Sequence, residues 1–351
     1  MATLYEVAFV ARIPSASGPP TLTELGPVKF SGLSWSDELG GDGRLDVATK
    51  IDSLDAPIKA RLTQLDQTPN ELWLYRNGTR VFAGPVTSYD VQNKRVLTMY
   101  APGLSYYLEY MIRDTDYAQT GVDQSLIAKD LVDTYQAQSY AHFGLDTVIP
   151  GSGTFRDLSL KGAEGKTLGS IIRTMGQREN GFDLAVDPVG RRIKMYSPRR
   201  GADLSTTVVI DRRNIVLPKV MLSVAAGIFA TRATVASSST TAGNLTSSAV
   251  NSVQEARFGR VMVAQQFSDI SVQSTLDDHA TRLAGNLSSP SFVVAPDIAP
   301  VTGLMPGDVA PGDQVTYDYD VGLGAQTLVR RITKIQVTVK RGKERMALTF
   351  L

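Results

Sequence analysis

The sequence contains no cysteine and only two histidines, His142 and His279, among its 351 residues. The lack of cysteine excludes disulfides, thiolate metal sites and cysteine nucleophiles. Two histidines leave little material for an imidazole metal site or for acid–base catalysis. His142 has no neighbour in the sequence that would orient its ring, so we expect it to have a surface or packing role.

The chain also lacks an excess of charge of either sign and any long apolar run. Its formal net charge is +1, so the overall charge of the protein does not favour binding to nucleic acid, anionic lipid or acidic substrates. Hydrophobic residues make up 42% and charged residues 20%, the balance of a soluble globular protein. The longest apolar run, at 220–230, is too short to cross a bilayer and predicts one or two buried strands. No basic stretch followed by an apolar one opens the sequence, so we expect no signal peptide.

Residues 1–110 have the pattern of β-strands. The clearest signal lies at 72–83, where two apolar segments flank Asn77-Gly78, a pair that tolerates the positive φ angles of a type I′ hairpin turn. Residues 86–91 are expected to pair with 96–100 across a turn at Asn93-Lys94. We predict an N-terminal β-barrel domain over 1–110.

Residues 111–200 change to a helical periodicity. Apolar residues at 126, 127, 131 and 135 follow Asp123, which predicts a helix capped by that carboxylate. A second helix is expected to begin at Thr167, with apolar residues at 168, 171, 172 and 175. Two short strands within 182–196 follow, joined by a turn at 187–190. The segment predicts a small α+β middle domain.

Residues 201–351 return to strands and predict a C-terminal β-barrel domain. One helix is expected over about 275–287, opened by Thr275 with Asp278 as a capping acid. The stretch at 237–248 is rich in serine and threonine and predicts a mobile loop. The order strand, turn, strand, strand, turn, strand occurs at 72–100 and again at 315–350, which makes a duplicated barrel a hypothesis.

Two short motifs suggest chemistry but have simpler interpretations, and a third is absent. The segment 161–167 precedes a helix, yet position 160 is leucine where a phosphate-binding loop needs glycine, so we predict a turn and a helix cap. Asp277, Asp278 and His279 diverge around a helix by about 100° each, which favours a helix cap and a solvated face over a metal site. A serine hydrolase needs a base and an orienting acid, and no G-x-S-x-G segment occurs.

Two clusters of like charge are candidates for interaction surfaces. The basic cluster consists of Arg191, Arg192, Lys194, Arg199, Arg200, Arg212 and Arg213. The acidic cluster consists of Asp308, Asp313, Asp318 and Asp320. The basic cluster lacks the interleaved aromatic residues of a single-strand binder, apart from Tyr196. In a ring of copies, patches of opposite sign are expected to form ion pairs between subunits that fix their register.

The order of these features resembles the minor tail proteins of long-tailed (siphovirus) actinobacteriophages, which form the tail-tip or baseplate hub. The matching segments are ELWLYRNGTRVFAGPV (71–86), LTMYAPGLSYYLEYMIR (97–113), LIAKDLVD (126–133), KTLGSIIRTMGQRENGFDLAVDP (166–188), STLDDHATRLAG (274–285) and PGDQVTYDYD (311–320). The resemblance lies in their order and spacing over nearly the whole chain. It implies an α+β, mainly β, tail-hub-like fold in which two β-barrels flank a small α+β domain.

The resemblance also implies a function. The chain would be a non-enzymatic virion protein without metal or cofactor, made in the host cytoplasm and placed at the distal tail tip. A homotrimer with two barrels per chain would form a pseudo-sixfold ring. The ring would join the tail tube or a distal tail protein above to threefold tip or fibre proteins below. The tape measure protein or DNA would occupy its lumen without specific nucleic-acid binding.

An alternative function is a tail-associated protein that binds or degrades cell wall or carbohydrate. Paired carboxylates that hydrolyse glycosides leave no short signature, and the chain has 35 acidic residues. A carbohydrate-binding face would need exposed aromatic residues. The two tryptophans, Trp35 and Trp73, both lie in strand patterns that predict burial.

Overall fold

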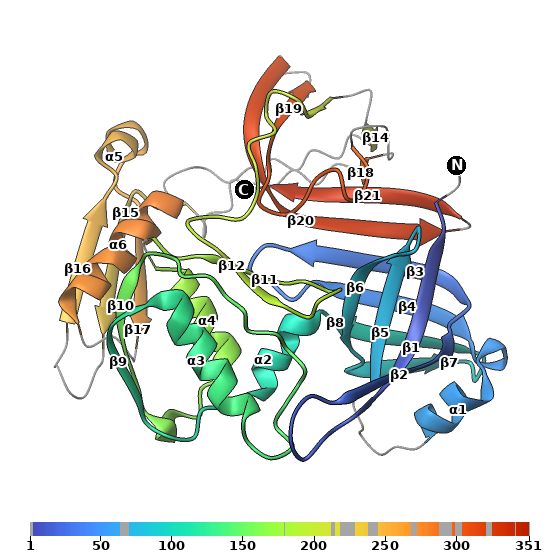
Figure 1. Cartoon of the computed structure of the whole chain (residues 1–351). Coiled ribbons are helices and arrows are strands. Elements are labelled where there is room, and N and C mark those ends of the chain that lie inside the picture. Colours follow the sequence, from blue (N-terminus) through green and yellow to red (C-terminus); the bar gives the residue numbers. More distant parts are fainter. Residues whose placement is uncertain are drawn as a thin grey trace.

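The computed structural model describes residues 3–63, 70–178, 180–211, 215–217, 229–237, 245–267, 272–287, 297–298, 304–320, 325–340 and 342–350. Strands dominate the described chain, and the helices lie at several places around them (Figure 1). The mainly β, α+β class predicted from the sequence is therefore confirmed.

The N-terminal strands form a four-stranded antiparallel sheet in the order β2-β1-β5-β6. Their bounds are Tyr5–Ile13 (β1), Thr21–Pro27 (β2), Asn70–Arg76 (β5) and Thr79–Pro85 (β6). The predicted hairpin is present, because β5 pairs with β6 around Asn77 and Gly78, whose φ angles are 51° and 80°. These left-handed values are the ones that a type I′ turn requires.

A larger sheet combines strands from both ends of the chain. Its main path is β14-β18-β21-β20-β3-β4-β8-β7, with β19 beside β20 and β13 beside β19. The N-terminal members are Phe30–Glu38 (β3), Arg44–Lys50 (β4), Ser88–Gln92 (β7) and Val96–Pro102 (β8). The C-terminal members are Val209–Ile210 (β13), Ile215–Leu217 (β14), Asp297–Ile298 (β18), Gln314–Asp320 (β19), Ala325–Lys340 (β20) and Lys343–Phe350 (β21).

Strand β20 holds this large sheet together. Its first half pairs with β19, and its second half pairs with β3 on one side and β21 on the other. The pattern at 315–350 predicted two strands here, but β20 changes partners at a bulge near Ile332 without a turn. The pairing of β3 with β20 brings the first and last segments of the sequence side by side (Figure 1).

One hydrophobic core lies between the two sheets and takes residues from both ends of the chain. Phe9, Leu74 and Met99 come from the N-terminal strands, and Val337 and Leu348 come from the C-terminal ones. Among the described residues neither sheet closes on itself into a barrel. The two β-barrel domains predicted at 1–110 and 201–351 therefore stay a prediction.

The middle of the chain forms a helical part with its own core. Its elements are Tyr107–Tyr110 (α2), Tyr117–Asp123 (β9), Gln124–Gln136 (α3), Phe155–Leu160 (β10), Leu168–Gly176 (α4), Asp183–Val186 (β11) and Ile193–Tyr196 (β12). Both predicted caps are present, because Asp123 accepts a hydrogen bond from the N–H of Ser125 and Thr167 accepts one from Ser170. Strands β11 and β12 form the predicted hairpin.

Short helical segments connect these elements. They are Ile51–Ser53, Ala56–Thr63 (α1), Leu104–Tyr106 and Gly162–Glu164. The last of them, with the Thr167 cap, confirms that the segment 161–167 is a turn before a helix.

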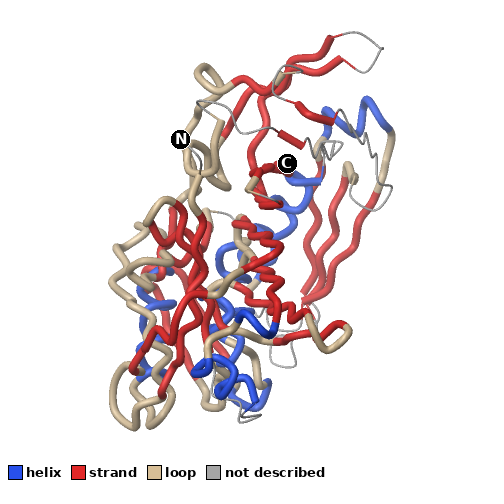
Figure 2. Tube along the Cα trace, turned by 90° about the vertical axis from the view of Figure 1, so that its right-hand side faces the viewer, coloured by secondary structure: helices blue, strands red, loops and turns tan. Residues whose placement is uncertain are grey.

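A third, smaller unit projects at one flank. It consists of Arg232–Ser237 (β15), Leu245–Val250 (β16), Ser252–Phe258 (α5), Met262–Phe267 (β17) and Gln273–Leu287 (α6). The three strands lie side by side in the order β16-β15-β17 (Figure 2). Helix α6 covers one face of this sheet, where Leu276 and Ala280 pack against Val235.

Two predictions for this unit were wrong. Helix α6 begins at Gln273, so Thr275 lies inside the helix and does not open it. The stretch 237–248 is not one mobile loop, because Ser237 ends β15 and residues 245–248 belong to β16. Leu245 and Ala249 on β16 contribute apolar side chains to the face that α6 covers, which explains the strand. Residues 238–244, and 220–228 of the apolar run, lie outside the described residues.

Candidate functional site: a charged junction between the sheets and the helical part

A buried carboxylate lies where the first sheet meets the helical part. Glu71, on β5, is fully buried and accepts hydrogen bonds from both terminal nitrogens of Arg191 at 2.8 and 3.0 Å. The hydroxyl of Tyr107 donates to the same carboxylate at 2.7 Å, and the indole N–H of Trp73 donates at 2.9 Å. Donors of this chain thus occupy the hydrogen-bond acceptor positions of both Glu71 carboxylate oxygens.

Arg191 connects three segments at this point. It lies just before β12 with a φ of 55°, a left-handed conformation that turns its side chain toward the first sheet. Besides Glu71, it donates to the backbone carbonyls of Phe143 and Gly144 at 3.0 Å each. Arg12, on β1, lies 4.8 Å from the ring of Phe143 and donates to the carbonyl of His142. The loop around residue 143 is therefore held between two arginines.

The ionisation of this cluster follows from its contacts. Burial raises the pKa of the Glu71 carboxyl, but the charge of Arg191 and the hydrogen bonds from Arg191, Tyr107 and Trp73 outweigh burial and hold that pKa below its ordinary value. Burial and the adjacent Glu71 charge raise the pKa of Tyr107 well above its ordinary value. The carboxylate is therefore charged and the phenol neutral at neutral pH, which suits an ion pair better than proton transfer.

A second set of ion pairs surrounds this buried one. Arg173 on α4 pairs with Asp42, in the turn between β3 and β4, at 2.7 Å and also with Glu109 of α2. Arg331 on β20 pairs with Asp183 of β11. The Arg173–Asp42 and Arg331–Asp183 pairs each join the helical part to the large sheet, so separate ion pairs hold the junction.

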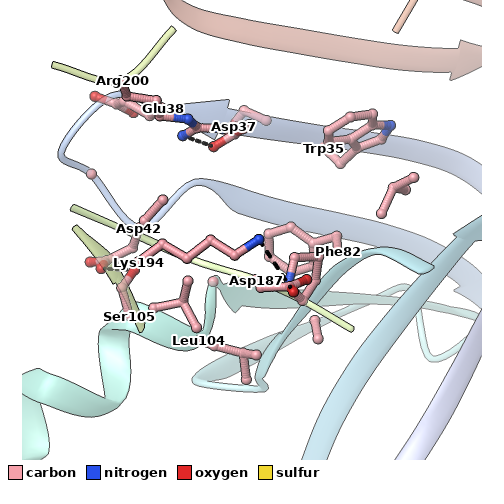
Figure 3. Close-up of a pocket in the computed structure, with 18 of the residues that line it drawn as sticks. Trp35, Asp37, Glu38, Asp42, Phe82, Leu104, Ser105, Asp187, Lys194 and Arg200 are labelled. Carbon is pink, nitrogen blue, oxygen red and sulfur yellow. Dashed lines mark hydrogen bonds and ion pairs between the residues drawn. The ribbon is translucent and has the colours of Figure 1, made fainter. Parts of the chain in front are cut away.

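Figure 3 shows a small cleft in this junction, between β3 and the hairpin β11–β12. Trp35, Phe82 and Leu104 form its apolar lining, and the cleft holds about 180 Å³. Arg200 pairs with Asp37 at 2.7 Å, and Lys194 pairs with Asp187 at 3.5 Å. Small-molecule sites typically hold about 300–1,000 Å³, so this cleft is small for a substrate.

The cleft also has an incomplete set of catalytic groups. The Ser105 hydroxyl donates to Asp42 at 2.7 Å, but neither histidine lines the cleft to act as a base. His142 accepts a hydrogen bond from the N–H of Gly144, and burial together with Arg12 lowers the pKa of His142. Across the described part of the chain, no group of three or more His, Asp or Glu residues is placed to hold a metal ion.

The structure brings together only part of the basic cluster predicted from the sequence. Arg191, Lys194 and Arg200 lie in the junction and pair with acids of the same chain, and Arg192 pairs with Asp146 at 2.7 Å. Arg199 is exposed. Arg212 and Arg213 lie outside the described residues.

The acidic residues of the prediction have local roles where they are described. Asp313 is buried and accepts from the N–H groups of Ala202 and Ala310, and Asp308 accepts from the N–H of Met305. Asp318 and Asp320 belong to β19. Ion pairing between subunits by either cluster stays a prediction.

For the Asp277-Asp278-His279 motif, the predicted solvated face was partly wrong. His279 is 7% exposed and packs on the ring of Phe267 at 4.6 Å between centroids. Asp278 lies 3.7 Å from Arg156 of β10, which attaches α6 to the helical part. Whether a helix face is buried depends on what packs against it. The sequence pattern did not indicate that β17 would cover His279.

Sequence reasoning missed Glu71, Tyr107 and Arg12. Glu71 stands directly before the strongly apolar LWLY stretch in a strand, a charge next to a buried segment that needs a partner. The sequence therefore indicated that Glu71 needs a partner, although it did not identify that partner.

No helix among the described residues is both long and apolar enough to cross a membrane. No protein family model matches the chain, and no curated protein matches it in sequence.

Several solved structures share the fold of this chain. The 43 kDa tail protein of prophage MuSo2 from Shewanella oneidensis has a TM-score of 0.67 at 11% identity, covering 99% of this chain and 98% of that one. The tail protein from Neisseria meningitidis MC58 has a TM-score of 0.65 at 13% identity, covering 99% and 96%. Prophage tail protein gp18 from Listeria monocytogenes EGD-e has a TM-score of 0.55 at 11% identity, covering 98% and 94%. At these identities the likeness establishes a shared fold over nearly the whole length.

Proposed function

We propose that the chain is a structural subunit of a bacteriophage tail, which acts by assembly and has no catalytic centre. The observation that carries this proposal is the agreement in fold with the Shewanella and Neisseria tail proteins over 98% and 96% of their lengths. The match includes both sheets, the helical part and the small flanking unit. It therefore supports a common role for the whole architecture and not for one widespread module.

The charged junction supports the same role. A subunit of a ring needs its parts held at fixed angles, since small rotations add up around the ring. A buried ion pair whose hydrogen bonds are all satisfied favours one arrangement over its alternatives. Glu71 and Arg191 provide such a contact between the first sheet and the hairpin of the helical part.

Within the tail, we place the chain at the distal tip as the hub, as in the siphovirus actinobacteriophage family that its sequence resembles. Three copies, each with two similar β-barrel modules, would present six similar surfaces in a pseudo-sixfold ring. A closed ring uses heterologous contacts, in which neighbouring copies bury different faces. Two strand edges suit such contacts: β7 is exposed along its whole length, and β16 pairs on one side only, with β15, in the described structure.

The partners follow from this position. A sixfold tail tube or distal tail protein would bind one side of the ring, and threefold tip or fibre proteins would bind the other. The tape measure protein or DNA would occupy the lumen without sequence-specific contacts. Ion pairs between the predicted basic and acidic clusters would set the register of neighbouring copies.

The mass of the purified chain tests the ring. Native mass spectrometry and light scattering are expected to give about three times the 37.9 kDa of one chain. A map of the phage particle is expected to show three copies around the tail axis. A particle that carries single copies away from that axis would contradict the hub, while leaving the shared fold untouched.

A separate measurement tests the absence of catalysis. The purified chain is expected to leave bacterial cell wall intact in a zymogram, with lysozyme as the positive control. Clearing by the chain, lost on replacement of one particular pair of acids, would establish the carbohydrate-degrading alternative instead.

A further inference from the structure

A second, larger cleft adjoins the junction and shares Arg173, Asp183 and Arg331 with it. It is bounded by the end of α4, the start of β11, α6 and the strand β20, and it holds about 710 Å³. That volume lies within the range of about 300–1,000 Å³ that is typical of binding sites.

The charged lining of this cleft is almost entirely basic. Its charged residues are Arg173, Arg178, Arg199, Arg282, Arg331 and Asp183. Arg331 and Arg173 are neutralised, the first by Asp183 and the second by Asp42 and Glu109. Among the described residues, Arg199 and Arg282 form no ion pair with a carboxylate. The cleft therefore has a surplus of guanidinium groups and few acids.

The contacts of Arg282 show how this charge is held in place. Its side chain is half-buried, and one terminal nitrogen donates to the carbonyls of Gly176, the last residue of α4, and of Arg178 just after it. Burial lowers the pKa of the Arg282 guanidinium, and the charges of Arg199 and Arg156 act in the same direction against that of Asp183. An arginine stays charged under such conditions. An anion that entered the cleft would therefore reduce the repulsion between Arg282 and the neighbouring arginines.

The remaining lining mixes polar residues with apolar ones, and the exposure of the apolar ones bears on which anion fits. Ile172, Phe182 and Leu184 form buried parts of the wall, and Val329 on β20 is 50% exposed at the rim. A single nucleic-acid strand binds through bases stacked on exposed aromatic rings. Phe182 is the one aromatic residue among the lining residues described, and it is 4% exposed. With Val329 half-exposed and no exposed aromatic ring among the described lining residues, the cleft suits carboxylates flanked by aliphatic side chains better than phosphates flanked by bases.

We propose that this arginine cleft binds an acidic peptide segment of a partner protein, with Arg199 and Arg282 holding its carboxylates and the rim around Val329 contacting its aliphatic side chains. The planar fork of a guanidinium bonds a carboxylate through two parallel N–H groups, which gives both affinity and orientation. The site depends on the charges of the cleft and would exist whether or not the chain assembles into a ring.

The test uses a fluorescein-labelled synthetic peptide that alternates glutamate and leucine, with fluorescence anisotropy of the full-length protein as the readout. The wild-type chain is expected to bind this peptide, and to lose affinity when glutamine replaces glutamate in the peptide. Arg199→Gln is expected to weaken binding about tenfold, equivalent to about 1.4 kcal/mol. Arg199 is exposed, so this variant is expected to fold normally.

Arg257→Gln is the matched control, because Arg257 lies on α5, outside the cleft. It is expected to change the affinity less than about twofold, equivalent to about 0.4 kcal/mol. A labelled oligothymidylate of similar length is the second probe. Absence of peptide binding, equal binding by Arg199→Gln, or a tighter, Arg199-dependent complex with oligothymidylate would each overturn the proposal.

Discussion

Glu71 and Arg191 stand 120 positions apart in the sequence and meet in a two-bond ion pair inside the protein. One residue belongs to the first sheet and the other to the hairpin of the helical part. Their carboxylate and guanidinium are removed from water, so each group depends on the other for compensation of its charge. The pair therefore fixes how the first sheet and the helical part are oriented.

Removal of one partner of this pair is expected to be costly. Arg191→Gln leaves the Glu71 carboxylate buried without its counter-charge, and we expect a loss of about 3–5 kcal/mol in the free energy of unfolding. Arg192→Gln is the neighbouring control, because the pair of Arg192 with Asp146 is partly exposed. An exposed pair contributes at most about 1 kcal/mol. Urea unfolding followed by circular dichroism measures both, and similar losses in the two variants would contradict the assigned role.

The same pair predicts a dependence of stability on pH. The folded-state pKa of Glu71 lies below its ordinary value of 4.5, so its contribution is present above that pH and is lost as the pH falls through the folded-state pKa. Glu71→Gln removes the group that titrates. The difference in unfolding free energy between wild type and Glu71→Gln is therefore expected to narrow as the pH falls below about 4.5. A difference that stays constant down to that acid range would show that Glu71 does not titrate as inferred.

Two glycines are expected to respond in opposite ways to alanine. A Cβ added to Gly84 on β6 would lie 1.7 Å from the carbonyl oxygen of Pro102 on β8, so the two strands would have to separate. We expect Gly84→Ala to destabilise the protein by about 1–3 kcal/mol or more. Gly285 on α6 has open space around it, and Gly285→Ala is expected to stabilise the helix by up to about 1 kcal/mol. Thermal unfolding compares the two; a neutral Gly84→Ala would show that β6 and β8 can move apart freely.

At two adjacent residues of α3, the burial observed in the structure differs although the sequence pattern predicts the same apolar face. Both Leu126 and Ile127 belong to the predicted apolar stripe, yet Ile127 is fully buried and Leu126 is 43% exposed. We expect Ile127→Ala to cost about 2–5 kcal/mol, as for other large-to-small core substitutions. Leu126→Ala is expected to cost about 0.5 kcal/mol or less. Chemical denaturation of the two variants measures the contrast. A large loss from Leu126→Ala would indicate that another surface covers this leucine in solution.

The local features of the fold could be predicted because their causes lie within a few residues. Asn77 and Gly78 adopt positive φ angles by themselves, and Asp123 and Thr167 cap helices through N–H groups two or three positions ahead. The apolar stripe of α4 pointed to its buried face for the same reason. Each of these elements carries its own signal.

The pairings between distant strands carry no such signal. Nothing in the sequence of β3 identifies β20 as its neighbour, so two separate modules were the simplest interpretation of two similar strand patterns. Strand β20 also differs from the predicted pattern: a bulge near Ile332 passes one continuous strand from one partner to the next where two strands were expected. The ion pair of Glu71 with Arg191 was missed for a related cause, since the two residues become a pair only after the chain has folded.

The pairing of β3 with β20 has a consequence for how the chain folds during translation. Ser34 and Gln336, hydrogen-bonded across these two strands, stand 302 positions apart. A ribosome releases β3 long before it begins β20, so during most of translation one edge of β3 offers unpaired N–H and carbonyl groups to any passing strand. The nascent chain therefore has to delay its large sheet, or have that edge of β3 shielded, until its last strands emerge.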